Sequence, residues 1–181
     1  MRYSKAGFAL IIVLLFLEIF SILSLYALEN IVLEKRLADQ FWRKHLMVMD
    51  AQTLLETLEK QISDNTSCLI PVSGVLELLA QTMPWWREVS CAGNFHLLQY
   101  YYVIEDLSRN TCSYIEQVEE GSVKKVRAGY FRLTLYLVNP LSVKERVMLQ
   151  SVVVVPVKVD EPCNGDMNLT IHGRKSWREL I

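Results

Sequence analysis

FALIIVLLFLEIFSILSLYAL, residues 8–28, is a run of 21 residues that holds one charged side chain, Glu18. Its length is about what a helix needs to cross the hydrocarbon of a bilayer. Arg2 and Lys5 lie before the run and Glu29 follows it, so the positive-inside rule places Met1 in the cytoplasm. We therefore predict one transmembrane helix, with everything after residue 28 outside the cytoplasm.

A cleavable secretory signal is the first alternative for this segment. Its apolar region would be about 7–15 residues long and would end in a small-x-small cleavage site. The run found here is longer, and Leu25-Tyr26-Ala27 is a poor match to such a site. A plain signal-anchor helix is the second alternative, and hydropathy alone does not exclude it.

The helix is predicted to continue far beyond the membrane, because no Gly or Pro occurs between Phe8 and Ile70. From residue 8 to residue 62 it would be about 80 Å long. Lys44 and His45 interrupt the heptad phase, which disfavours a coiled-coil stalk. Apolar residues instead recur at helical spacing, which predicts that residues 29–62 pack against their own domain; this stripe comprises Leu37, Phe41, Val48, Ala51, Leu55, Leu58 and Ile62.

The remainder of the chain, residues 63–181, is the size of one small domain. The formal net charge is −1, from 19 basic and 20 acidic residues, and no basic face for nucleic acid is indicated. Strands are predicted at residues 100–107, 130–138 and 147–159. The second is the clearest, since Phe131, Leu133, Leu135 and Leu137 alternate with polar or larger residues.

Together these segments predict an α+β fold in which the long helix covers an antiparallel sheet. Asn139 to Ser142 marks the turn between the last two strands. Pro156 cannot donate a ladder hydrogen bond, so the end of the third strand is expected at an edge or bulge. Residues 73–82 predict a short helix with Ser73 as N-cap and Pro84 beyond its end.

All four cysteines follow the predicted membrane span, and none forms a Cys-x-x-Cys pair. An oxidising compartment and this spacing favour disulfides over a metal site. In a meander the first and third strands end on the same side of the sheet. Cys112 and Cys163 follow those two ends, so we pair them and leave Cys68 with Cys91.

The start of the chain resembles a known family. Lys5-Ala6-Gly7-Phe8-Ala9-Leu10, a basic leader followed by Gly-Phe and an apolar helix, resembles the class III signal of type IV pilins and type II secretion pseudopilins. The resemblance implies that residues 1–7 are a leader, that a prepilin peptidase cuts after Gly7, and that it methylates the new N-terminus at Phe8.

The resemblance also has a departure. Pilins of the shaft carry a glutamate five residues into the mature chain, where it neutralises a neighbouring N-terminal amine, and here that position is Ile12. An ammonium without a partner in hydrocarbon is costly. Loss of this carboxylate resembles the PilX and GspK class of minor subunits, which are placed at the tip. Glu18 lies about 9 Å further along the helix and about 240° around it, so it forms a different site. We expect it to contact a protein partner in the membrane or to be protonated, and the alternative is a neutral carboxyl group without a role.

Motifs for enzymatic chemistry are not found: the sequence has no phosphate loop, dinucleotide Gly motif, G-x-S-x-G or H-E-x-x-H. No catalytic residue, cofactor or metal is predicted. Glu116, Glu119 and Glu120 are interpreted as a solvated loop rather than a calcium site. Trp85 and Trp86 either fill a gap under the sheet or form a partner-binding patch, and residues 173–181 are either a docking segment or loose.

The strand sequences YYVIEDL, YFRLTLYLV and RVMLQSVVVV also resemble the C-terminal half of PilX-like minor pilins. The family implies a subunit that enters the bacterial inner membrane with a periplasmic domain and then moves to the pilus tip. Implied partners are other minor pilins, the major pilin, a PilY-class tip adhesin, the prepilin peptidase and the membrane assembly platform. The alternatives are a GspK-like pseudopilin of type II secretion, whose inserted domain is larger than residues 63–99 can hold, and a signal-anchored periplasmic binding or enzyme module.

Overall fold

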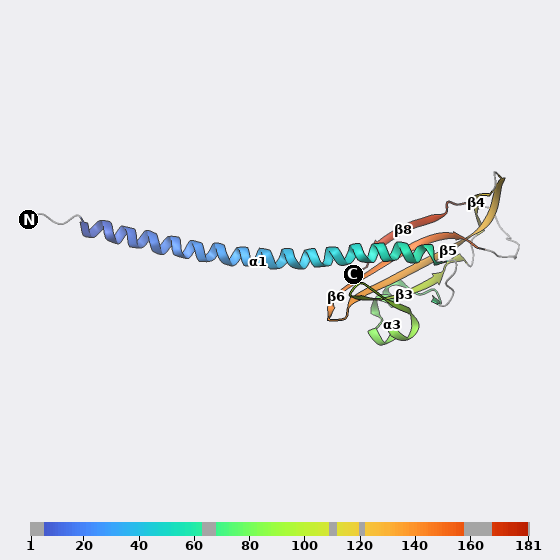
Figure 1. Cartoon of the computed structure of the whole chain (residues 1–181), viewed down its shortest axis with the longest axis horizontal. Coiled ribbons are helices and arrows are strands. Elements are labelled where there is room, and N and C mark those ends of the chain that lie inside the picture. Colours follow the sequence, from blue (N-terminus) through green and yellow to red (C-terminus); the bar gives the residue numbers. More distant parts are fainter. Residues whose placement is uncertain (1–5, 63–67, 109–111, 120–121, 158–167, 181) are drawn as a thin grey trace, which may run out of the picture. The chain divides into compact units, whose positions relative to one another are not determined.

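The structure is a computed structural model that describes residues 6–62, 68–108, 112–119, 122–157 and 168–180. The chain divides into two compact units, Met1–His45 and Leu46–Ile181. One helix, α1 (Ala6–Lys60), contributes to both (Figure 1). The prediction of a helix without a break is confirmed, with its end two residues before the expected Ile62.

In the second unit, the C-terminal turns of α1 pack on a sheet. Ala51, Leu55, Leu58 and Ile62 are buried there, as the predicted stripe requires. Leu37 and Phe41 are wrong as members of this packed stripe, because their side chains are 58% and 75% exposed. The reason is that burial on α1 starts only at Met47, close to the point where the second unit begins; further buried residues of α1 are Met47 and Leu54.

Within the described residues, eight strands form one mixed, mostly antiparallel sheet, which confirms the α+β class. The central order is β1-β3-β5-β4-β7, while β2 pairs with β3, and β6 lies between β5 and β8. The bounds are β1 (Leu69–Ile70), β2 (Cys91–Phe95), β3 (Leu98–Asp106), β4 (Ser113–Glu119), β5 (Ser122–Asn139), β6 (Ser142–Pro156), β7 (Asn168–Leu169) and β8 (Gly173–Glu179). Only the short pairs β1–β3 and β4–β7 are parallel.

The three predicted strands correspond to β3, β5 and β6, which form the expected antiparallel meander. β5 is much longer than predicted because its first residues, before Ala128, pair with β4. Pro156 is the last residue of β6, beyond the part that pairs with β8, and a register shift lies between Val152 and Val153. The expectation of an edge or bulge near this proline is therefore confirmed.

Both faces of the sheet are covered within the second unit, one of them by the C-terminal turns of α1. Alternation along β5 sends Leu133, Leu135 and Leu137 to α1 and Tyr136 to the other face. The second face is covered by α2 (Val75–Ala80) and α3 (Met83–Val89). Burial on both faces explains why the core strands are apolar on both sides.

The short helix predicted within residues 73–82 is confirmed as α2, and Pro84 lies beyond its end, but its N-cap is Gly74 rather than Ser73. A second helix, α3, was not predicted: it begins after Thr82 and has Pro84 in its first turn. Proline is favoured in the first turn because its missing N–H would have no helical partner there. The C-terminal tail is not loose either, since residues 173–179 form β8.

Candidate functional site

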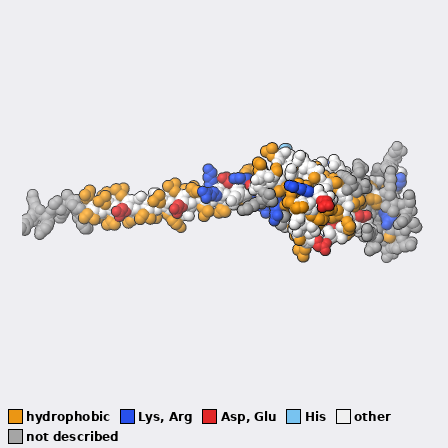
Figure 2. Space-filling model, turned by 90° about the horizontal axis from the view of Figure 1, so that it is seen from below, with side chains coloured by type: hydrophobic (Ala, Val, Ile, Leu, Met, Phe, Trp, Pro, Cys, Tyr) orange, Lys and Arg blue, Asp and Glu red, His pale blue; other side chains and the backbone are white. Residues whose placement is uncertain are grey.

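The N-terminal part of α1 is the candidate membrane anchor. Among the described residues it is the one helix long and apolar enough to cross a membrane, and none of its apolar window is buried. Figure 2 shows hydrophobic side chains along this part of α1, interrupted by a few acidic ones. An exposed apolar surface of this length is compatible with a membrane anchor.

The two predicted processing residues, Gly7 and Phe8, lie in the first turns of α1. Their side chains are outside the described part of the structure. Ile12, four residues after Phe8, is 39% exposed. Cleavage after Gly7 and methylation of Phe8 stay predictions.

Glu18 lies one and a half turns beyond Ile12, and its side chain is exposed. Within the described part of the chain it makes no hydrogen bond or ion pair. Its neighbours one turn away are Leu14 and Ile22, both more than half exposed. The site is therefore an isolated carboxyl group on an apolar helix, open to a partner.

The disulfide between Cys68 and Cys91 is confirmed, with the two Cα atoms 5.4 Å apart. It joins the residue before β1 to the first residue of β2 and so closes the segment that holds α2 and α3. Cys112 is also disulfide-bonded. Its predicted partner, Cys163, lies outside the described residues.

Among the described residues, no group of three or more potential metal ligands lies together, and the absence of a metal stays a prediction. Of the acidic cluster, Glu116 and Glu119 belong to β4 rather than to a loop. Glu120 lies outside the description. The chain's cofactor prediction, none, is not tested by this.

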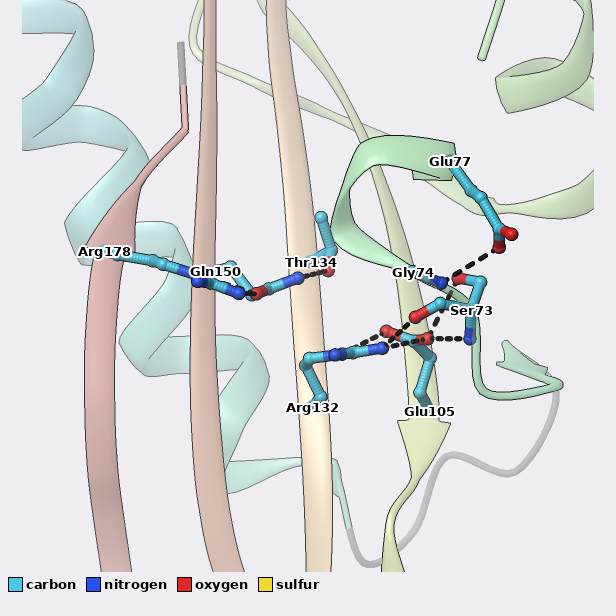
Figure 3. Close-up of polar contacts among 8 residues, drawn as sticks. All are labelled: Ser73, Gly74, Glu77, Glu105, Arg132, Thr134, Gln150 and Arg178. Atoms are coloured by element: carbon cyan, nitrogen blue, oxygen red, sulfur yellow. Dashed lines mark hydrogen bonds and ion pairs between the residues drawn. The ribbon is translucent and has the colours of Figure 1, made fainter. Parts of the chain in front are cut away.

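A buried charge cluster, which sequence reasoning missed, joins β3, β5 and the entry to α2 (Figure 3). Arg132 Nε and Nη2 donate to the two carboxylate oxygens of Glu105, each at 2.6 Å. The N–H and hydroxyl of Ser73 donate to Glu105 Oε1 at 2.7 and 3.0 Å. Arg132 Nη2 also donates to the Ser73 carbonyl. Ser73 is thus an anchor for the loop before α2 and not the N-cap we predicted.

The two charged side chains at the centre of this cluster are largely buried. The Glu105 side chain is 0% exposed and that of Arg132 is 14% exposed. Hydrogen bonds from the guanidinium to Glu105 raise the pKa of Arg132 above its ordinary value. Gly74, the N-cap of α2, donates its N–H to the Glu77 carboxylate at 2.9 Å. Side-chain hydrogen bonds therefore hold both Ser73 and Gly74 at the start of the helix. We interpret this cluster as structural, because each of its charged groups is paired within the same chain.

A second polar chain crosses the sheet next to it. Gln150 Nε2 donates to Thr134 Oγ1 at 2.9 Å, and Arg178 Nε donates to Gln150 Oε1 at 3.0 Å (Figure 3). Gln150 is buried, and it therefore needs both partners. This chain fastens β8 to β6 and β5 through side chains, in addition to the backbone ladder.

The structure also shows where Trp85 and Trp86 lie. Trp86 is 1% exposed and stacks on Tyr136 of β5 with ring centroids 5.3 Å apart. Trp85 is half-buried and meets Trp86 edge to face. The reading in which these residues fill the gap between a short helix and the sheet is confirmed for Trp86.

A surface hollow of about 540 Å³ lies between α1, β6 and the start of β8, with Val153, Val155 and Pro156 among its walls. Arg174 of β8 reaches across to α1, where it donates to Glu59 at 2.9 Å. The ion pair between Arg174 and Glu59 thus joins α1 to β8 at the edge of this hollow.

The described residues thus define an α+β chain with one helix suited to a membrane anchor and a disulfide in its folded unit. Comparison with known proteins adds no closer assignment: no family model, no curated protein and no solved structure matches the chain.

Proposed function

We propose that the chain is a PilX-like minor pilin, a structural subunit that acts at the tip of a type IV pilus and in priming its assembly. The observation that carries the proposal is one helix, α1, which begins at the Gly7–Phe8 sequence, is apolar through the predicted span, and ends packed on an antiparallel sheet. A helix with these two successive environments suits a subunit that is first held in a membrane and then extracted into a fibre.

Ile12 supports the tip position within this proposal. A shaft subunit uses a carboxylate there to neutralise the N-terminal amine of its neighbour, and isoleucine carries no charge and no group that accepts a hydrogen bond from that amine. A subunit without that carboxylate is suited to a place that no neighbour's N-terminus must reach. Partners would then be other minor pilins, the major pilin and a PilY-class adhesin, after passage through the inner membrane and periplasm.

The rival within the same class is a GspK-like pseudopilin. In the described part of the segment between α1 and β3, the structure has β1, two helices of six and seven residues, and β2. This is too little chain for the large inserted domain of GspK-like subunits, which favours the pilus role. A signal-anchored periplasmic module is the rival from another class, and it predicts an uncut N-terminus.

Intact-mass analysis of the membrane-extracted protein tests the proposal, in a host that has the prepilin peptidase. The expected mass is that of a chain starting at Phe8 and carrying one added methyl group. A Gly7→Val variant should stay uncut, whereas the control Ala9→Val, two residues away, should still be processed. A wild-type chain that retains Met1 refutes the pilin assignment and leaves the signal anchor.

Deletion of the gene then separates the two pilin-like roles. Loss of surface pili with normal protein secretion is expected for the PilX-like subunit. Loss of secretion with normal pili would instead assign the chain to a type II secretion system.

A further inference from the structure

Glu18 and the face of α1 that carries it are the basis of a further inference about the first unit. Glu18 is the only charged residue in residues 8–28, and no described residue pairs with it. Its exposed side chain would meet lipid if α1 crossed a membrane alone. Ionisable residues inside a membrane usually face protein, and they mark the place where a partner binds.

The helix repeat places further residues on the same face. On an α-helix, residues 7 or 11 positions apart lie within about 20° of each other around the axis, so Leu25 and Glu29 lie in line with Glu18. Arg36 follows Glu18 by 18 positions, which is five full turns, and therefore lies on the same face. Leu25, Glu29 and Arg36 also line one shallow hollow on the surface of α1, together with Val32 and Leu33. Leu25, Val32 and Leu33 are each more than half exposed. The face is thus apolar, with three charged residues along it.

The order of these charges selects the partner. Along the face a carboxylate at Glu18 is followed by a second at Glu29, about 16 Å further on, and by a guanidinium at Arg36 after about another 10 Å. A second copy inserted at the same depth would set Glu18 against Glu18, Glu29 against Glu29 and Arg36 against Arg36. Like charges at each level disfavour that pair, and a copy inserted in the opposite direction would break the positive-inside rule.

We propose that this face of α1 binds one transmembrane helix of a different protein, which offers a cationic or hydrogen-bond-donating side chain at the depth of Glu18. The same helix carries a basic group beside Glu29 and an acidic group beside Arg36. The apolar residues between them supply close packing, which holds helices together where lipid is as apolar as the side chains. The inference rests on the membrane insertion contained in the proposed function, and not on cleavage after Gly7.

The test uses the full chain in its native membrane, with a benzophenone amino acid at Ile22, one turn from Glu18, or at the control position Phe20, about 200° around the helix from Glu18. Irradiation is expected to join the Ile22 probe, and not the Phe20 probe, to one protein identified by mass spectrometry. That protein's membrane segment must contain a Lys, Arg, His, Asn or Gln.

In the same background, Glu18→Leu should lower the adduct yield by about three- to twentyfold, and Glu18→Gln by less, because an amide still forms a hydrogen bond.

Ser24→Leu is the matched control, since it also replaces a polar residue of the span by leucine, but on a face about 240° away. It should leave the yield unchanged. A Glu18→Lys variant should lose the adduct and regain it when the partner's cation is changed to glutamate.

Adducts only with lipid or with a second copy, a partner without a donor, or a yield that Glu18→Leu leaves unchanged would each overturn the inference. Alkaline-carbonate extraction of the same membranes reports on insertion separately, so failure of the anchor is told apart from failure of the docking face.

Discussion

Replacing Arg132 by methionine removes the one cation that pairs with the buried Glu105 among the described residues. The variant keeps most of the side chain's volume, so the main change is electrostatic. Glu105 would keep the two hydrogen bonds from Ser73 but lose both bonds from the guanidinium, each 2.6 Å long in the structure. Leaving one member of a buried pair without its partner costs about 3–5 kcal/mol. Small domains have an unfolding free energy of about 5–15 kcal/mol in total, so this loss is a large fraction of it.

Equilibrium urea unfolding of the full chain in a mild detergent measures the effect, followed by tryptophan fluorescence, to which the buried Trp86 contributes. Arg174→Met is the matched control, because Arg174 also pairs with a carboxylate, that of Glu59, at a distance of 2.9 Å, but its side chain is 30% exposed. Exposed pairs contribute about 0–1 kcal/mol. The two Arg→Met variants should therefore differ by at least about 2 kcal/mol in unfolding free energy.

A second substitution separates the buried charge from simple loss of packing. Adding Glu105→Gln to Arg132→Met removes the charge while the amide oxygen still accepts from Ser73. The double variant should regain about 1–3 kcal/mol relative to Arg132→Met alone. The reasoning would be refuted by an Arg132→Met variant no less stable than Arg174→Met, or by a double variant in which the two effects simply add.

Three further outcomes are expected in the second unit. Replacing both Cys68 and Cys91 by serine should lower the unfolding free energy by about 3 kcal/mol, the loop-closure value for their separation of 23 residues, as a thermal melt in detergent will measure. Gly93→Ala should lose about 1–3 kcal/mol, because the new methyl would lie 2.8 Å from Tyr100 Cε1, and full stability in urea would argue against that contact. Trp86→Leu should lower the melting temperature, since ring stacking and buried area are lost together, and an unchanged near-ultraviolet circular dichroism spectrum would contradict its place in the core.

The parts of the fold that the sequence predicted correctly are those with a local signal. The long helix follows from a stretch without Gly or Pro, and β5 follows from the alternation around Leu133 and Leu135. The disulfide between Cys68 and Cys91 followed from the direction of the strands. Each of these needs only neighbours in the chain or one simple rule of topology.

The parts that were missed depend on partners distant in the chain. β8 has charged residues at most of its positions, and only its pairing with β6 makes it a strand. Ser73 has the residue type of an N-cap, but its hydroxyl donates to Glu105, which is 32 residues away in the chain. One signal was present: Glu105 and Arg132 are charged residues inside two predicted strands. Antiparallel pairing of those strands sets them directly opposite each other, but this requires the register.

The candidate site shows the same division. Glu18 was singled out correctly as the one charge in the apolar span, because composition alone reveals it. What it contacts depends on another molecule, which one sequence does not describe. The exposed apolar part of α1 likewise has no cover among the described residues of its own unit.

The position of β8 along the chain affects how the protein is made. β6 contains four consecutive valines, Val152 to Val155, and β8 pairs with the edge of β6 from Leu149 to Val154. The ribosome completes β6 before β8, and at about 5–20 residues per second the delay is roughly one to five seconds. During that interval a newly made chain has an apolar strand without its neighbour, and the best substitute is the same strand of another newly made chain. A high local concentration of newly made chains would therefore favour pairing of β6 between chains over its native pairing with β8.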